Sequence, residues 1–343
     1  MNDFDVFFKE NSNKVNENTV LIIVCNAKSK THTLKDYNGF SINTEFLSDE
    51  ELKEITEMAE KQRLPFRIFY DEKDFMEFLI ENQQNCTNFM VYNSAQNGIG
   101  PGRKALIPSI CKFFNIRYTG SDPYRVCLCR DKFAVYSLLT VANIKMPKSE
   151  LFLYNNTKLN LRTDLTYIAK PIYESSSLGI TSQNVFKGTL IPYVYLTDLS
   201  KKMQQPILIQ QFIKGYEIEV PVLVGKKSSF VFSPVVLHKD DNALEMDSEI
   251  LDYNRIYNDD YLFSSFPNCF DDTDVKSTAE KVVRLLGLNG LCRVDFRYQS
   301  SGEFYVTDVS TNPHFINHSS VNFAFRNLGL KNEDIFKTIL ALS

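Results

Sequence analysis

Apolar runs alternate with amphipathic stretches along the first third of the chain. The pattern predicts strands at 20–25, 65–70 and 89–92 and helices at 48–62, 74–81 and 104–114. Ser48 and Glu51 have the spacing of a capping box, which marks the start of the first of these helices. Strands that alternate with helices predict a parallel sheet covered by helices, and ligands bind at the carboxyl ends of the strands in such sheets.

Two alternating runs near the end of the chain predict a β-hairpin. They span 291–297 and 304–310 and flank the polar turn 299–302. Because side chains alternate between faces along a strand, Arg293 and Asp295 share one face. A turn centred on Ser301–Gly302 would place Asp295 opposite Asp308. The same register would place Arg293 opposite Ser310.

One face of this hairpin would therefore carry two carboxylates, a guanidinium and a hydroxyl. Carboxylate oxygens suit Mg²⁺ that bridges phosphate groups, and an arginine suits an oxyanion that develops during a reaction. A solvated strand face with one cross-strand ion pair explains the same pattern, because polar alternation is common in antiparallel sheets. The hairpin alone leaves both interpretations open.

Composition narrows the class of protein. With 343 residues, of which 43% are hydrophobic and 23% charged, the chain fits a soluble globular protein of two or three domains. The net charge of −4 argues against a nucleic-acid binder, which needs a basic face. The N-terminus is acidic and polar, and the apolar run 20–25 is too short to span a membrane. Seven scattered cysteines fit free thiols in a reducing compartment, so we expect a cytoplasmic protein.

Four ordered motifs resemble those of the ATP-grasp ligases, specifically the D-alanine–D-alanine ligase-like group. They are Tyr118-Thr-Gly-Ser121 with Asp131-Lys132, the segment 169–179 (Ala-Lys-Pro-Ile-Tyr-Glu-Ser-Ser-Ser-Leu-Gly), the segment 207–217 (Ile-Leu-Ile-Gln-Gln-Phe-Ile-Lys-Gly-Tyr-Glu), and the hairpin with Pro313 and Ser319. Together they cover roughly residues 92 to 325, and the resemblance is specific because the motifs occur together, in order and at sensible spacing.

The resemblance implies a mixed α/β and α+β class, the ATP-grasp fold. An N-terminal parallel-sheet substrate domain would span 1–123, a central lid subdomain 124–214 and a catalytic subdomain 215–343. We expect an ATP-dependent ligase that forms a C–N bond through an acyl phosphate, with ATP and Mg²⁺ (or Mn²⁺) as cofactors. The expected partners are small-molecule carboxylates and amines, without nucleic acid or membrane, and a homodimer stays open.

The resemblance also assigns roles to individual residues. Those assigned to the nucleotide are Lys132, Lys170, Glu174, Ser175, Ser176, Ser177, Gln210, Gln211, Phe212, Ile213 and Glu217. The lysines would contact phosphates, the serine loop would cover them, 210–213 would hold adenine and Glu217 the ribose. Arg293 would stabilise the tetrahedral oxyanion, and Ser319 would bind the carboxylate end of the incoming substrate. The expected metal ligands are Asp295, Asp308 and Ser310.

The chain departs from the family's pattern around the metal and the nucleotide. Asp308 stands where a glutamate is usual, and Ser310 where an asparagine is usual. A shorter carboxylate can still bind Mg²⁺, but bridging two ions would need backbone movement. Gln210 replaces a common acidic residue. These substitutions support an alternative, a catalytically weakened nucleotide-binding protein that signals by ligand-dependent closure.

The N-terminal part departs further from the pattern. The family's glycine-rich loop with its amine-binding glutamate is missing, and this chain has Asn-Ala-Lys-Ser-Lys at 26–30. We therefore expect a first substrate other than D-alanine. Lys28, Lys30 and Arg103 would favour a substrate with an additional carboxylate or phosphate, unless they are ordinary surface residues. The loop 97–103 (Asn-Gly-Ile-Gly-Pro-Gly-Arg) is interpreted as a substrate-facing loop, with a plain connector as the alternative. His314, where the family has glycine, would narrow the second-substrate pocket or add a titratable group.

Overall fold

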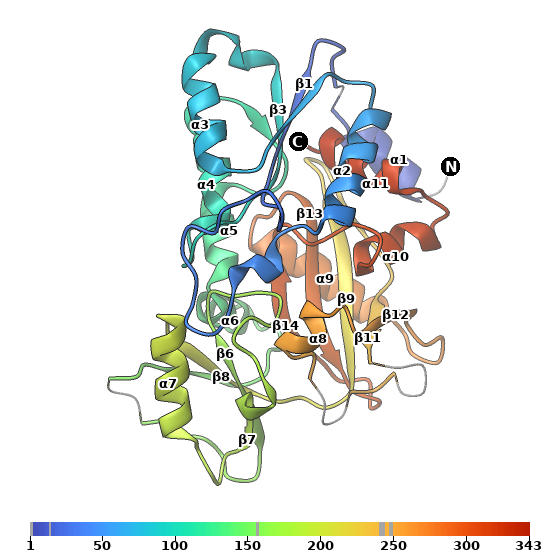
Figure 1. Cartoon of the computed structure of the whole chain (residues 1–343). Helices are drawn as coiled ribbons and strands as arrows, with labels where there is room; N and C mark the ends of the chain where they lie inside the picture. Colours follow the sequence, from blue (N-terminus) through green and yellow to red (C-terminus); the bar gives the residue numbers. More distant parts are fainter. Residues whose placement is uncertain (1–2, 14, 156–157, 240–243, 247–249) are drawn as a thin grey trace.

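The computed structural model describes residues 3–13, 15–155, 158–239, 244–246 and 250–343, and these form three β-sheets (Figure 1). The first sheet is parallel, with strand order β2-β1-β3-β4. Its strands are β1 (Val20–Cys25), β2 (Phe66–Phe69), β3 (Phe89–Ser94) and β4 (Arg117–Tyr118). Its helices are α2 (Asp49–Lys61), α3 (Glu72–Glu81) and α4 (Leu106–Phe113), with short 3₁₀ turns η1 (Ile42–Glu45), η2 (Gln83–Asn88) and η3 (Arg103–Ala105). The parallel sheet expected from the sequence is confirmed.

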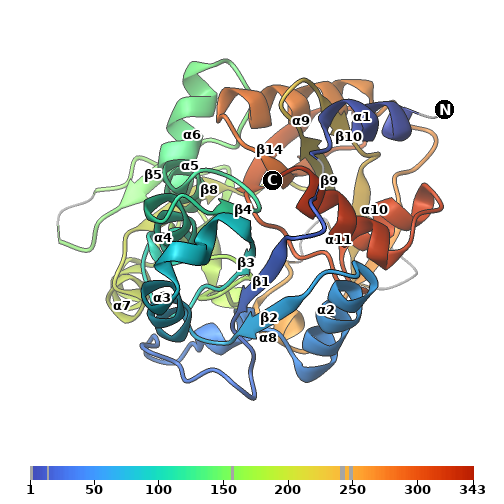
Figure 2. The same cartoon turned by 90° about the horizontal axis from the view of Figure 1, so that it is seen from above.

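Helices cover both faces of this sheet. Phe75 of α3 and Ile107 of α4 pack with Val91 on one face. On the other face, α2 packs beside two helices from the end of the chain, α10 (Ser320–Asn327) and α11 (Asn332–Ala341). Figure 2 shows α2 and α3 on opposite sides of the sheet. The carboxyl ends of β1 and β3 consequently face the interior of the molecule.

The second sheet is antiparallel, with strand order β5-β8-β6-β7. Its elements are β5 (Ser149–Phe152), β6 (Thr166–Pro171), η4 (Ser182–Asn184), β7 (Val185–Lys187), α7 (Tyr193–Met203) and β8 (Ile207–Gln211). It forms the lower part of Figure 1, with α7 packed on one face through Leu196 and Leu199. The helices α5 (Pro123–Arg130) and α6 (Lys132–Val141) lead into it from the first sheet.

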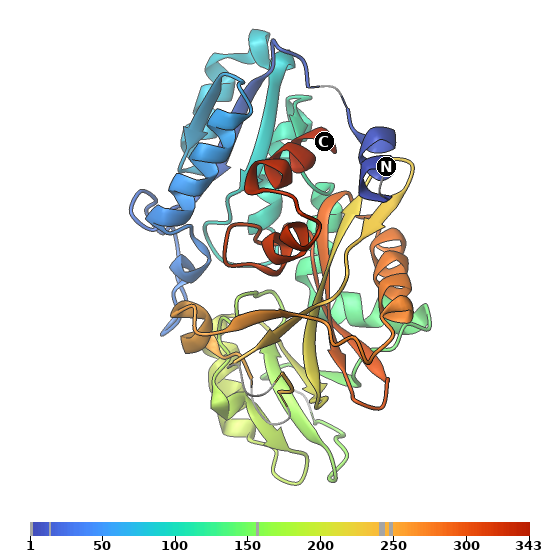
Figure 3. The ribbon, with the colours of Figure 1, turned by 90° about the vertical axis from the view of Figure 1, so that its right-hand side faces the viewer.

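The third sheet has the strand order β12-β11-β9-β13-β14, and β10 pairs with β9. Its elements are β9 (Tyr216–Val224), β10 (Ser229–Val231), β11 (Val235–His238), α8 (Tyr253–Tyr257), β12 (Leu262–Ser265), α9 (Thr273–Leu285), β13 (Gly290–Tyr298) and β14 (Phe304–Ser310). Viewed from the side, this sheet lies between the first and second sheets (Figure 3). Its outer face is covered by α9, and α1 (Asp3–Asn11) packs near β10. Within the described residues, no helix is long and apolar enough to cross a membrane.

The hairpin β13–β14 has the facing residues expected from the sequence. Asp295 pairs with Asp308, and Arg293 pairs with Ser310. The turn alone does not produce this register. The pairs closer to the turn follow a different register, in which Phe296 pairs with Val306. The register shifts by one residue between Asp295 and Phe296, which places an extra residue in β14 as a β-bulge. The bulge, rather than the turn's centre, brings the two carboxylates opposite each other.

Candidate active site

A single cavity of about 740 Å³ collects residues from all three sheets. Its volume lies within the usual range for small-molecule sites. It is lined by every residue that the resemblance assigns to the nucleotide, the metal, the oxyanion or the incoming substrate: Lys132, Lys170, Glu174, Ser175, Ser176, Ser177, Gln210, Gln211, Phe212, Ile213, Glu217, Arg293, Asp295, Asp308, Ser310 and Ser319. The hairpin face is therefore the wall of a shared cavity. The competing interpretation, a solvated strand face with one ion pair, does not fit this arrangement.

The hairpin carries a dense set of charges into this cavity. Arg293 donates to both carboxylate oxygens of Asp295, at 2.7 and 2.9 Å. Its third nitrogen lies 2.9 Å from Oε2 of Glu219 on β9, a buried carboxylate that the sequence motifs did not indicate. Lys132 Nζ donates to Asp308 Oδ2 at 2.6 Å. The guanidinium expected to face an oxyanion is thus fixed by two acidic neighbours.

The two facing carboxylates differ in their electrostatics. Burial raises the pKa of Asp295, and although Arg293 opposes the rise, Asp308 adds to it. Burial also acts to raise the pKa of Asp308, but Lys132 outweighs it and holds that pKa below its ordinary value. A bound divalent cation would relieve the repulsion between the two groups.

The donor set fits Mg²⁺, although the protein supplies few ligands. Asp295 and Asp308 offer hard carboxylate oxygens on one face, with the hydroxyl of Ser310 two residues away on the same strand. In the described part of the chain, no three His, Cys, Asp or Glu side chains gather as a metal site. Mg²⁺ usually keeps several waters and takes substrate phosphates in addition to one or two carboxylates. Two carboxylates are therefore enough for a metal that arrives with a nucleotide.

Another part of the cavity wall has the character of a nucleotide pocket. Gln210 is buried, and its Oε1 accepts a hydrogen bond of 3.0 Å from Lys170 Nζ. Its amide nitrogen has no partner among the described residues, so it could donate to a ring nitrogen of adenine. Arg297 lies over the ring of Phe212 at 5.2 Å and holds Glu217 at 2.9 Å, which orients that carboxylate. Burial lowers the pKa of Lys170 to about 8, so a phosphate would favour its charged form.

The serine loop after β6 has an unusual backbone. Ser176 and Ser177 have φ of 52° and 51°, in the left-handed region that L-residues with a side chain seldom occupy. Gly179 has φ 82°, and a Cβ there would lie 2.8 Å from Pro171 Cγ. Ser177 Oγ donates to Leu251 O at 2.5 Å, which ties the loop to the third sheet's side of the cavity. Backbone held in this way is typical of loops that bind ligands.

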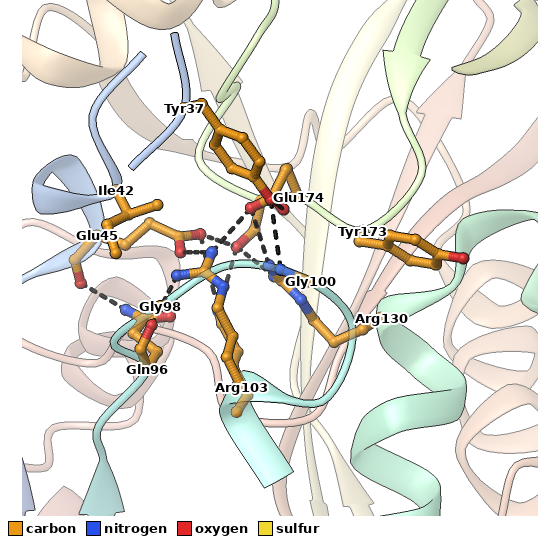
Figure 4. A network of polar contacts seen from close by, with 12 residues as sticks. Tyr37, Ile42, Glu45, Gln96, Gly98, Gly100, Arg103, Arg130, Tyr173 and Glu174 are labelled. Atoms are coloured by element: carbon orange, nitrogen blue, oxygen red, sulfur yellow. Dashed lines mark hydrogen bonds and ion pairs between the residues drawn. The ribbon is translucent and has the colours of Figure 1, made fainter. Parts of the chain in front are cut away.

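Glu174 precedes this loop and is fully occupied by protein donors. Tyr37 Oη donates to its Oε1 at 2.5 Å, and Arg103 Nη2 donates to its Oε2 at 2.8 Å. Arg130 Nη2 adds a contact of 3.2 Å (Figure 4). Gln205 Nε2 adds another of 3.2 Å. These contacts favour a structural role for the Glu174 side chain over the expected direct contact with nucleotide. Its carboxylate anchors the loop.

Arg103 is not the substrate-facing cation that the sequence suggested. Its side chain is only 2% exposed and lies between Glu45 and Glu174 (Figure 4). Glu45 is buried too, and although burial alone would raise its pKa, Arg103 and Lys104 hold the pKa below its ordinary value. Of the loop 97–103, no residue lines the cavity, so it serves as the connector that delivers Arg103 and Lys104.

The part of the cavity near the loop 26–30 contains a carboxylate that the sequence analysis did not expect there. The loop 26–30 indeed carries no acidic residue, but Glu51 of α2 lines the cavity beside it, with Glu50 and Glu54. The backbone joins the two segments, because Lys28 N donates to Leu47 O at 2.8 Å. Glu51 Oε1 lies 2.9 Å from His314 Nε2. A carboxylate is therefore present, and the capping box at Ser48 was the signal that could have located it.

Ser319 lines the cavity but also begins a helix. Its Oγ accepts a hydrogen bond of 3.1 Å from Asn322 N, as the N-cap of α10. Its hydroxyl hydrogen remains able to donate to a substrate oxygen. Nearby, His318 contacts Asp259 at 2.5 Å, and its ring packs in a tilted arrangement against Tyr261, with 4.7 Å between the ring centroids.

Comparison with known proteins gives a consistent result. The family model for the D-Ala–D-Ala ligase C-terminus matches residues 133–341. The D-alanine–D-alanine ligase of Bordetella pertussis is 28% identical over 251 residues, which cover 70% of this chain and 74% of that protein. The ligase of Buchnera aphidicola is 25% identical over 258 residues, covering 73% and 80%.

Solved structures show the same fold. The D-alanine–D-alanine ligase of Bacillus anthracis in complex with ATP aligns with a TM-score of 0.66 at 15% identity, over 94% of this chain and 97% of that one. The VanG D-Ala:D-Ser ligase of Enterococcus faecalis aligns with a TM-score of 0.64 at 17% identity, over 95% and 99%. The expected ATP-grasp fold is confirmed.

Proposed function

Because the chain belongs to the D-alanine–D-alanine ligase family of ATP-grasp enzymes, and is thus an ATP-dependent ligase that forms C–N bonds, we propose that it activates a carboxylate other than D-alanine. The acyl group then passes to an amine. The observation that supports the ligase reaction is the single cavity where the hairpin's carboxylates, two lysines and the serine loop meet, whereas the choice of donor rests on the contact of His314 with Glu51.

The reaction would proceed in two steps. A carboxylate oxygen of the donor forms a bond to the γ-phosphorus of ATP, and the bond from that phosphorus to the β,γ-bridging oxygen breaks as ADP leaves. The amine nitrogen then bonds to the carbonyl carbon of the acyl phosphate, phosphate leaves with the electron pair of the C–O bond, and the nitrogen loses a proton. Little covalent chemistry falls to the protein, which contributes position and charge.

The residues divide this work between them. Lys132 and Lys170 would bind the phosphates, and Arg293 would stabilise the oxyanion of the second step. Asp295 and Asp308, with Ser310, would hold Mg²⁺, which supplies charge neutralisation at the phosphates when bound. Gln210 to Ile213 would hold adenine, Glu217 the ribose and Ser319 a substrate carboxylate.

The donor proposal now rests on His314. Glu51 could bind a donor's ammonium, but His314 Nε2 already contacts it at 2.9 Å, and Ser48 N donates to its other oxygen at 2.6 Å. The imidazole occupies a position where the family's pattern has glycine. The proposal of an additional acidic group on the donor now depends on Lys28, which lines the cavity, because Arg103 is buried and paired.

We expect D-alanine to be at least about 10²-fold poorer as donor than the best carboxylate, since an ammonium that cannot displace the histidine stays unpaired. The test compares D-alanine, acidic amino acids and N-blocked carboxylates in steady state. His314→Gly should raise the use of D-alanine, whereas His32→Gly, at an exposed position outside the cavity, should not. Efficient D-alanyl-D-alanine formation by the natural protein would refute the donor proposal.

The alternative function is nucleotide binding with signalling by closure. It is supported by Asp308 and Ser310, which stand where the family usually has glutamate and asparagine. Both natural residues line the cavity. If they only tune the metal site, the double variant Asp308→Glu, Ser310→Asn should change ATP turnover modestly, within about tenfold. Binding of ATP without cleavage by the natural protein over a broad substrate panel, together with turnover by the double variant, would favour the alternative.

A further inference from the structure

Lys104 is a cation that the family motifs do not include and that reaches the serine loop. It lies on η3, directly after Arg103, and lines the cavity. Its Nζ donates to Ser175 Oγ at 3.1 Å. The same hydroxyl accepts from Arg130 Nη1 at 2.8 Å and donates to Glu45. Two cations from different segments thus converge on the first serine of the loop expected to cover the phosphates.

Charge around this hydroxyl is not balanced by the protein. The buried cluster has the cations Arg103, Lys104 and Arg130 and the anions Glu45 and Glu174. Arg103 contacts both carboxylates, and Arg130 contacts Glu174 at 3.2 Å (Figure 4). Lys104 has only a distant ionic contact, 3.8 Å from Glu45 Oε1. When Lys104 is protonated, the cluster has three cations against two carboxylates, and the excess positive charge lies on Lys104, which lines the cavity.

A buried positive charge without a counter-ion is costly, and an anionic ligand would supply the missing negative charge. The ligand must lie beside Ser175, at the point where the N-terminal domain meets the phosphate loop. A nucleotide held by Lys132 and Lys170 would place its terminal phosphate under this loop. The segment expected to hold adenine and ribose, 210–217, is separate from the side chains that contact Ser175 Oγ, which belong to Glu45, Lys104 and Arg130.

We propose that Lys104 is a further catalytic residue of this ligase, one that contacts the anionic oxygens of the phosphoryl group during its transfer from ATP to the donor carboxylate. The inference rests on the proposed function. No proton moves in this step, and Lys104 acts by its charge, which stabilises the oxygens around phosphorus as the bond to ADP breaks. Arg130 and Glu45 would position it through Ser175.

The electrostatics of the ligand-free protein agree with this role. Burial, together with Arg130 and Arg103, lowers the pKa of Lys104 to about 7, although Glu45 and Glu174 oppose the shift. A phosphoryl group beside Nζ would favour the protonated form and raise this pKa. At pH 8, binding of a nucleotide with a γ-phosphoryl group should therefore take up a proton, and binding of ADP should not involve Lys104.

The test combines calorimetry with kinetics. Binding of β,γ-imido-ATP and of ADP, each with Mg²⁺, is measured at pH 8 in buffers of different ionisation enthalpy for the natural protein, Lys104→Met, Lys104→Arg and the control Lys112→Met. Lys112 lies on α4, exposed and outside the cavity. We expect both Lys104 variants to lose the proton taken up with the imido analogue, and ADP binding to be unchanged in all four proteins.

In turnover, Lys104→Met should lower kcat by about 10²-fold or more, with a change in KM for ATP below about fivefold. Lys104→Arg keeps the charge and should recover most of that loss. Equal proton uptake in the natural protein and Lys104→Met, or an unchanged kcat, would overturn the inference. If the natural protein releases no ADP with any substrate, the proposed function fails instead, and calorimetry still decides whether Lys104 meets the phosphoryl group.

Discussion

Asp308→Ala is expected to reduce Mg²⁺-dependent ATP turnover by about 10³-fold or more, and Asp295→Ala by a similar factor. Each change removes one of only two carboxylates that would hold the metal, and a metal contributes several kcal/mol to the stabilisation of phosphoryl transfer. Asp308 also pairs with Lys132 at 2.6 Å, so its loss frees a lysine assigned to the phosphates. Turnover is measured as ADP release at saturating ATP and Mg²⁺.

The matched control is Asp198→Ala, an exposed aspartate on α7 that pairs with Lys202 outside the cavity. Folding is checked by the melting temperature without ligand, which should fall little in the cavity variants. ATP with Mg²⁺ should raise the melting temperature of the natural protein by mass action, and this rise should shrink in both variants. Unchanged turnover in Asp295→Ala and Asp308→Ala together would remove the metal assignment.

Arg103→Met is expected to lower the free energy of unfolding by about 3–5 kcal/mol, the usual cost of leaving a buried charge unpaired. Glu45 and Glu174 would lose the guanidinium between them, and their side chains are 1% and 0% exposed. Because Glu174 anchors the serine loop, ATP turnover should fall as well. Urea unfolding with the variant and the natural protein measures the first effect.

Arg284→Met provides the comparison. Arg284 pairs with Glu280 on the exposed side of α9, with half its side chain accessible to solvent. Such pairs contribute little to stability, so its unfolding transition should nearly match that of the natural protein. If Arg103→Met unfolds at the same urea concentration as Arg284→Met, the buried network does not hold the loop as described.

Local patterns were sufficient to predict most of the fold and the facing residues of the hairpin. The apolar run at β1 and the capping box at Ser48 identified elements whose signals lie within a few residues. The pairing of Asp295 with Asp308 was also predicted, but from an assumed turn centre. In the structure a bulge supplies the shift, and bulges leave no signal in the alternation of the partner strand.

Contacts between distant segments could not be predicted in this way. Arg103 and Glu45 lie far apart in sequence, and only the fold reveals that a guanidinium near the expected pocket is neutralised. The loop 26–30 has no glutamate, and the sequence alone therefore suggested a site without a carboxylate at this position. Glu51 supplies one from α2, after a long connection that follows β1. Lys104 stands next to a glycine-rich loop, and its approach to Ser175 depends on how η3 meets the loop after β6.

The most direct test of the central claim is ADP release by the natural protein across a panel of carboxylate donors and amines, with mass detection of any coupled product. The account predicts that at least one pair gives one amide for each ADP, only with ATP and Mg²⁺, and that Asp308→Ala gives neither. ATP bound at the cavity but never cleaved, across the whole panel and without an amide product, would contradict it.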